Sequence, residues 1–86
     1  MHDNDAALSD KARLRLDVGA LPRAYPGEMW VDRGIGDVCS LCERVLQPVH
    51  VVYALSWDRR RYRLHTRCFG AWTAELLRRG WYTLLD

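Results

Sequence analysis

Three cysteines and one histidine form two short pairs that are spaced like the ligands of a structural zinc site. The first pair is Cys39 and Cys42, the second is His65 and Cys68, and 22 residues separate the pairs. Zinc takes four nitrogen or sulfur ligands in a tetrahedron, and a site closed by three thiolates and one imidazole leaves no position for a catalytic water. The sequence therefore predicts bound Zn²⁺ as scaffolding, in a protein that is not an enzyme.

Each pair can supply two ligands to one ion. Two cysteines with two residues between them can face an ion across a tight turn, and a histidine and a cysteine three apart share one face of a helix. A disulfide between Cys39 and Cys42 is an alternative, but it would leave Cys68 as an odd thiol and give His65 no role. A C-x-x-C redox couple is another, but the surrounding βαβ pattern is missing. We therefore favour zinc.

Length and composition are typical of one small globular domain. The chain has 86 residues, a size at which one hydrophobic core gives little stability and a metal ion helps. No apolar run approaches the roughly 20 residues of a membrane span, and the first five residues are acidic where a signal peptide would be basic. We expect a cytoplasmic protein with no membrane partner and no small-molecule substrate.

The basic residues are concentrated in the second half of the chain. The formal net charge is only +2, and three thiolates with one Zn²⁺ would bring it to about +1. Twelve of the thirteen basic residues are arginine, and seven of these lie between Arg59 and Arg79. Arginine suits bidentate phosphate recognition, although GC-rich coding accounts for the preference equally well.

The first 38 residues are predicted to form a helix and an extended arm. Residues 1–8 resemble a frayed polar start, Ser9 can cap a helix that continues to Val18, and Gly19 would end it. The helical face would contain Leu14, Val18 and Leu21, although the alternation of Leu14, Leu16 and Val18 also fits a strand.

Prolines and glycines predict an extended or turning chain over residues 19–37. Trp30 and Val31 interrupt this segment, and we expect them to pack over the zinc module. The predicted organisation is therefore an N-terminal arm, residues 1–38, packed on a zinc-binding module, residues 39–86.

A hairpin and a helix follow the first cysteine pair. Residues 49–55 are a β-branched run of strand length, residues 56–60 begin with turn character, and residues 61–64 alternate polar with apolar side chains. From Thr66 onward, apolar residues recur at helical spacing until Gly80. Residues 81–85 would form a closing strand or an apolar tail.

This order of zinc knuckle, hairpin and helix resembles the treble-clef zinc finger. Residues 39–68 are similar to the first zinc module of a LIM domain, with the same ligand types in the same order, but no second LIM module follows. The resemblance implies an α+β fold with a structural zinc ion and an N-terminal helical and extended arm.

The chain also resembles small uncharacterised bacterial proteins over residues 21–72. The similarity rests on a Leu-Pro-Arg segment at residues 21–23, on Trp30, and on a Gly-x-Gly lead-in at Gly34 and Gly36. The C-x-x-C pair and a His-x-x-Cys-(x)3-Trp helix ending at Trp72 follow. This resemblance implies a fold and a metal, and no settled activity.

The hairpin tip is a candidate nucleic-acid contact. Arginines neutralise phosphates and exposed aromatic rings stack on bases, so a tip that mixes both can follow a nucleic-acid backbone. The candidate residues are Trp57, Arg59, Arg60, Arg61, Arg63 and Arg67. Edge arginines also prevent aggregation between strands, and Trp57 can equally be a core residue.

The competing function is that of a LIM-like adaptor for protein–protein interaction, including self-association, or of a small regulatory protein that binds no nucleic acid. Four tryptophans and four tyrosines are many for one small core, and treble clefs serve both kinds of partner. Catalysis is disfavoured, because its one candidate is His50, which begins a valine-rich strand without a neighbouring carboxylate or amide to orient it.

Overall fold

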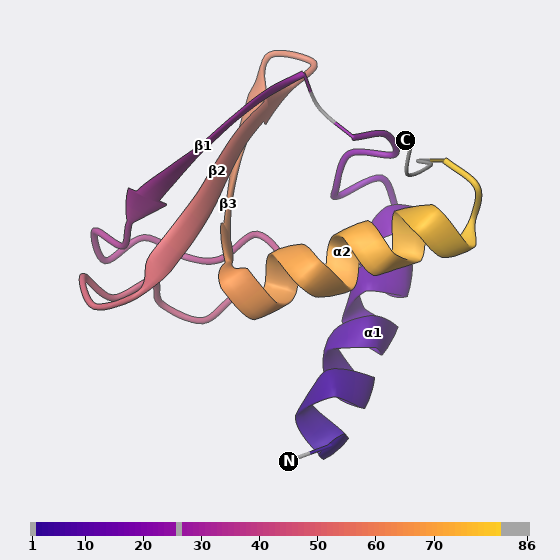
Figure 1. Cartoon of the computed structure of the whole chain (residues 1–86), viewed down its shortest axis with the longest axis horizontal. Helices are drawn as coiled ribbons and strands as arrows, with labels where there is room; N and C mark the ends of the chain where they lie inside the picture. The colour runs from indigo at the N-terminus through magenta and orange to yellow at the C-terminus, as the bar shows by residue number, and fades with distance from the viewer. Residues whose placement is uncertain (1, 26, 82–86) are drawn as a thin grey trace, which may run out of the picture.

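The structure is a computed structural model that describes residues 2–25 and 27–81, and it confirms the predicted α+β class (Figure 1). The elements are α1 His2–Asp17, β1 Glu28–Arg33, β2 Val51–Trp57, β3 Arg60–His65 and α2 Thr66–Arg78. Neither helix combines the length and the apolar character that crossing a bilayer would require, over the part of the chain that the structure describes.

The three strands form one antiparallel sheet with β2 in the centre. Val31 pairs with Tyr53 in β2, and Tyr53 pairs in turn with Leu64 in β3. The predicted hairpin is confirmed, and its turn is tighter than the sequence indicated. Trp57 pairs with Arg60, so only Asp58 and Arg59 connect the strands, both at positive φ (49° and 67°). Two left-handed residues match the twist of the flanking strands.

Helix α2 follows β3 directly and ends as predicted. Gly80 adopts a φ of 75°. Its N–H donates to the Leu77 carbonyl at 3.1 Å, and the Trp81 N–H donates to the Leu76 carbonyl at 2.9 Å. These two bonds form a Schellman motif, which needs a residue without a Cβ penalty at the left-handed position. Of the predicted segment 81–85, residues 82–85 lie outside the described residues.

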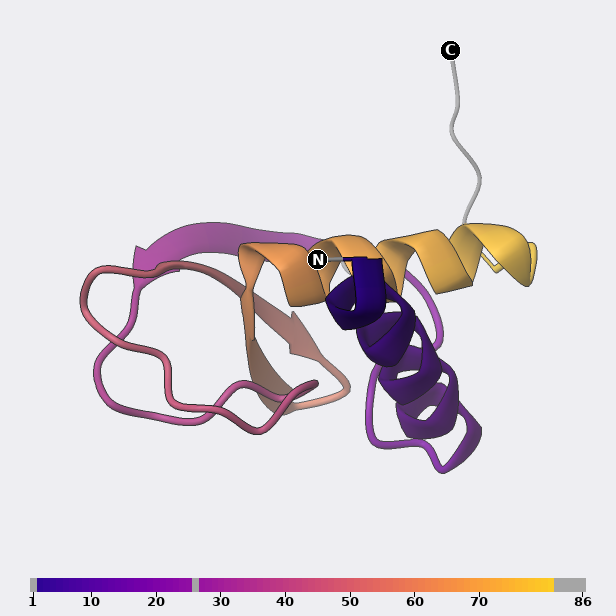
Figure 2. The same cartoon turned by 90° about the horizontal axis from the view of Figure 1, so that it is seen from below.

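Helix α1 begins earlier than predicted and buries a different face. It starts at His2, so residues 2–8 are helical rather than frayed, and Ser9 lies within the helix instead of capping it. Leu14 and Val18 are exposed, whereas Ala12 and Leu16 are fully buried. The good helix formers at residues 6–8 extend the helix, and packing against α2 selects its buried face (Figure 2).

Strand β1 is the element that the sequence did not predict. Trp30 and Val31 belong to this strand and are exposed, by 42% and 64%, so the expectation that they pack over the zinc module is wrong. β1 pairs with β2 on one side only, and all but one of its side chains are exposed. Backbone pairing, rather than side-chain burial, therefore holds this segment in place.

One hydrophobic core joins the N-terminal part of the chain to the part that carries the cysteine and histidine cluster. Fully buried leucines come from α1, from the segment before β2, from β3 and from α2, and they include Leu16, Leu41, Leu46, Leu64 and Leu76. Residues 1–38 and 39–86 thus contribute to the same core and, through β1, to the same sheet.

A buried carboxylate connects the two helices. Glu75 in α2 is 5% exposed and forms ion pairs with Arg78 and with Arg79, the second at 2.8 Å. Arg79 also pairs with Asp17 at the end of α1, at 2.9 Å. The hydrogen bond from Arg78, followed by that from Arg79, lowers the pKa of Glu75 to about 2 against the opposing effect of burial.

We expect Glu75→Gln to lose about 2 kcal/mol of unfolding free energy at pH 7, because it removes the negative charge that accepts three charge-assisted hydrogen bonds from Arg78 and Arg79. The folded pKa lies below the ordinary value of 4.5, so the stabilisation is present above that pH and disappears as the pH falls toward 2. Because protonation of the cysteines would release zinc in acid, the test is a double-mutant cycle at pH 7 with Glu75→Gln, Arg79→Gln and the double variant, measured by urea denaturation of the zinc-loaded proteins. Losses that simply add would contradict an electrostatic origin. The ion pair of exposed Glu43 with half-buried Arg15 provides the control, since Glu43→Gln should cost under about 0.5 kcal/mol.

Candidate metal centre

The four predicted metal ligands lie together. Their ligand atoms, the Sγ of Cys39, Cys42 and Cys68 and a ring nitrogen of His65, are all within 4.8 Å of one another. The Nδ1 of His65 lies 3.4 Å from the Cys42 Sγ and 3.9 Å from the Cys68 Sγ. Tetrahedral zinc with ordinary bond lengths would separate sulfur and nitrogen ligands by about 3.6 Å. The donor set and its spacing therefore fit one metal ion.

The first two ligands are presented by a tight knuckle. The Cys39 N–H donates to the Arg44 carbonyl at 2.9 Å, and the Glu43 N–H donates to the Cys39 carbonyl at 3.0 Å. Glu43 adopts a φ of 66°, which reverses the chain directly after Cys42. Leu41 is fully buried, and its N–H donates to the Cys39 Sγ at 3.4 Å. The knuckle is thus anchored in the core by the residue between its cysteines.

The second two ligands come from the junction of β3 and α2. His65 is the last residue of β3 and the N-cap of α2, with extended backbone angles of −60° and 156°. Cys68 lies three residues later, in the first turn of α2, and is buried. Because the strand runs directly into the helix, no loop intervenes that could separate the two ligands.

The thiols are arranged for ionisation at a shared centre. The pKa of Cys39 is lowered to about 4, first by a hydrogen bond from the Cys68 thiol and then by backbone N–H groups that include that of Leu41. The pKa of Cys68 is raised, because it donates that bond, is buried and lies beside two other thiols. A cation can replace the proton that these sulfurs share, and metal binding releases protons for this reason.

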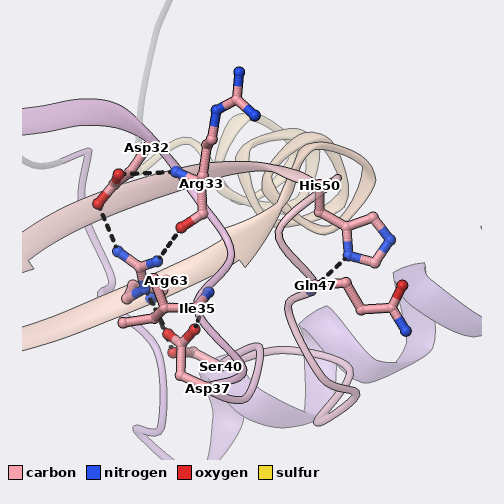
Figure 3. A network of polar contacts seen from close by, with 8 residues as sticks. All are labelled: Asp32, Arg33, Ile35, Asp37, Ser40, Gln47, His50 and Arg63. Atoms are coloured by element: carbon pink, nitrogen blue, oxygen red, sulfur yellow. Dashed lines mark hydrogen bonds and ion pairs between the residues drawn. The ribbon is translucent and has the colours of Figure 1, made fainter.

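Arg63 ties the knuckle, β3 and the segment before the knuckle together. Its guanidinium bonds to Asp37 at 2.5 Å, to Asp32 at 2.9 Å and to the Arg33 carbonyl at 2.6 Å (Figure 3). Its backbone carbonyl accepts from the Ser40 N–H at 2.9 Å, and its N–H donates to the Ser40 Oγ at 3.2 Å. The Arg63 side chain, predicted as a phosphate contact, is therefore engaged within the protein.

The other predicted nucleic-acid contacts lie in two separate places, the end of the hairpin and the start of α2. Arg59, Arg60 and Arg61 are exposed at the hairpin end, and Trp57 is 37% exposed beside them. Arg60 and Arg61 point to opposite faces of the sheet, because side chains alternate along a strand. Arg67 lies in the first turn of α2, next to the metal centre at the other end of β3. The predicted residues therefore do not converge on one face.

His50 lies at the metal centre and not within a strand. It precedes β2, and its Nδ1 accepts the Gln47 N–H at 3.0 Å (Figure 3). Its ring stands edge-on to that of His65, with centroids 4.8 Å apart. Sequence reasoning placed this residue in a strand because of the valines around it. The turn at residues 47–50 brings it beside the ligand instead.

Several residues that shape the centre carried no strong sequence signal. Ser40, Asp32 and Asp37 support it through Arg63, but single polar residues in loops and edge strands are too common to be informative. In the sequence, Gly34 stands out only as part of a Gly-x-Gly pair. Gly34 is buried, and a Cβ at this position would lie 2.1 Å from the Gln47 carbonyl oxygen. The chain before the knuckle therefore passes the chain after it at a distance that only glycine permits.

Comparisons of the chain with protein-family models, with curated protein sequences and with solved structures gave no match. The geometry of the residues themselves is therefore the basis for assigning a function.

Proposed function

We propose that the protein is a non-catalytic, zinc-stabilised module of the treble-clef type that acts in the cytoplasm. Three sulfur donors and one nitrogen donor suit Zn²⁺, and four protein ligands close its tetrahedron. The order of knuckle, hairpin and helix supports the treble-clef assignment. None of the three cysteines forms a disulfide, which agrees with a reducing compartment.

We further propose that the end of the β2–β3 hairpin binds nucleic acid through its backbone. The observation that supports this function is the cross-strand pair of Trp57 and Arg60, which are both exposed on the same face beside the turn residue Arg59. Within the described residues, none of these arginines forms an ion pair, whereas Arg63 is fully engaged. A flat aromatic ring next to free guanidinium groups can stack on a base and neutralise adjacent phosphates.

We expect replacement of Arg59, Arg60 and Arg61 by alanine to reduce the salt dependence of duplex DNA binding. Each lost phosphate contact lowers the slope of log K against log salt by about 0.9, so the slope should fall by up to about three. Fluorescence anisotropy with labelled single- and double-stranded oligonucleotides at several salt concentrations measures this slope.

A matched pair of single variants isolates the position of the contact. Arg60→Ala should lower the slope by about one, whereas Arg33→Ala should leave it unchanged, although Arg33 is also an exposed arginine in a strand at the edge of the sheet. Zinc content and melting temperature should stay the same in both, because exposed arginines contribute little to stability. If the unaltered protein bound no oligonucleotide even at low salt, the nucleic-acid function would be wrong.

The edge strand β1 favours a protein partner as the second candidate function. Its outer backbone groups face away from β2, and Trp30 and Val31 are exposed on it. Such an edge can accept a further strand from a partner or a second copy. Val31→Pro should block the pairing of a further strand with β1, and the variant should keep its nucleic-acid binding at the hairpin.

A further inference from the structure

A cavity of about 610 Å³ opens beside the metal centre. Three of the metal ligands, Cys42, His65 and Cys68, form part of its wall. The cavity includes the space at these ligands, but its volume is far larger than one ion occupies and lies in the range of pockets that hold small organic ligands. Metal binding alone therefore does not account for the cavity.

The remaining wall combines positive charge with apolar surface. Lys11 from α1 and Arg44 from the end of the knuckle both line the cavity, and neither side chain forms an ion pair within the described part of the chain. Leu8, Val45 and Val51 supply the apolar surface. No aspartate or glutamate is found among the described residues of the wall. This composition suits a ligand with an anionic group and a less polar body.

The start of α2 adds to the preference for an anion. Thr66, its first residue, lines the cavity, and the first turn of α2 contains no acidic residue. His65, at the N-cap, makes no side-chain capping bond. The free N–H groups at a helix N-terminus attract negative charge. Three thiolates and one Zn²⁺ would leave the metal centre with a single negative charge, which Lys11 and Arg44 together exceed.

His50 adds a hydrogen-bond donor to the wall. Its Nδ1 accepts the Gln47 N–H, so in the neutral ring the proton is on Nε2. We propose that the cavity binds a phosphate-bearing ligand of mononucleotide size, with its phosphate at Lys11 and Arg44 and its sugar or base against Leu8, Val45 and Val51. The phosphate belongs either to a free nucleotide or to the terminus of an oligonucleotide. This site is separate from the hairpin end, because all of β3 lies between them.

Titration calorimetry on the zinc-loaded full chain tests the site with AMP and with adenosine, which differ only in the phosphate. AMP should bind at least about tenfold more tightly than adenosine, since charge-assisted bonds to the phosphate provide the difference. Lys11→Gln and Arg44→Gln should each weaken AMP binding about tenfold. Arg60→Gln, at the hairpin end, should leave AMP binding unchanged, which separates this site from the proposed nucleic-acid surface.

Oligonucleotides with and without a 5′-phosphate distinguish the two sources. If the 5′-phosphate tightens oligonucleotide binding, and Arg44→Gln weakens that binding as much as it weakens AMP binding, the site belongs to a chain terminus. If AMP binds but the 5′-phosphate makes no difference to oligonucleotide binding, the site belongs to a free nucleotide. Equal binding of AMP and adenosine, or binding of neither, would overturn the proposal. The proposal would also be overturned if the unaltered protein bound no AMP and the Lys11→Gln and Arg44→Gln variants lost zinc. The two cations would then serve only to balance the charge of the metal centre.

Discussion

Cys68→Ser is expected to abolish the folded state at room temperature. The substitution exchanges one sulfur for oxygen at a buried residue in the first turn of α2, so it would remove one ligand of the proposed zinc ion while changing the packing very little. Binding of structural zinc contributes roughly 10–16 kcal/mol in small zinc modules, which exceeds or equals the whole stability of most domains of about this size. The loss cannot be offset by a core that an 86-residue chain provides.

Elemental analysis and circular dichroism provide the measurement. The natural protein should contain one zinc per chain, lose its tertiary signal with a strong chelator and regain it when zinc is added. Thr66→Ser is the matched control, because it lies in the same helical turn and keeps the hydroxyl that donates to the Val51 carbonyl. Metal-free protein that stays folded, or a native disulfide between Cys39 and Cys42, would refute the structural role of zinc.

The metal ligands could be predicted from sequence because their chemistry is confined to two short segments. Each pair is local, so the spacing alone brings its two donors together, and only the meeting of the two pairs depends on the fold. The hairpin and α2 were predictable for a similar reason. β-branched residues, helical spacing and Gly80 are signals that act over a few residues.

Strand β1 could not be predicted, because its place depends on a neighbour far away in sequence. Its residues pair with β2 more than 15 positions later, and the segment from Glu28 to Arg33 lacks the regular alternation of polar and apolar side chains that marks a half-buried strand. The wrong prediction for Arg63 has the same cause. A run of arginines indicated phosphate binding, but the sequence did not show that Asp32 and Asp37 would form ion pairs with Arg63.

The face of α1 was predicted wrongly for a related reason. Leu14 and Val18 are as apolar as the residues that are buried, so hydrophobicity alone did not distinguish the two faces. Packing against α2 determines which face of α1 is buried, and the ion pair between Asp17 and Arg79 adds to this contact at the end of α1. Tertiary packing therefore determines which face of a helix of mixed polarity is buried.

Trp72→Ala should cost about 3–5 kcal/mol of unfolding free energy, the second largest effect that we expect. Trp72 is fully buried in α2, and its Nε1–H donates to the Pro22 carbonyl at 2.9 Å. Its ring lies nearly parallel to that of Tyr25, with an interplanar angle of 13° and centroids 6.2 Å apart. One side chain thus holds the segment between α1 and β1 against the helix that carries Cys68. Its removal would leave a large cavity and an unpaired buried carbonyl.

Thermal and urea denaturation of the zinc-loaded variants measure this cost, at about 4–8 °C of melting temperature per kcal/mol for a domain of this size. Trp72→Phe retains most of the ring packing and should lose less, because only the bond to Pro22 and part of the ring are removed. Trp57→Ala is the matched control at the surface and should change stability by less than about 0.5 kcal/mol, while weakening nucleic-acid binding at the hairpin. A Trp72→Ala protein that kept its full melting temperature would show that the segment from Leu21 to Tyr25 is held by other contacts, and that the core does not depend on this ring.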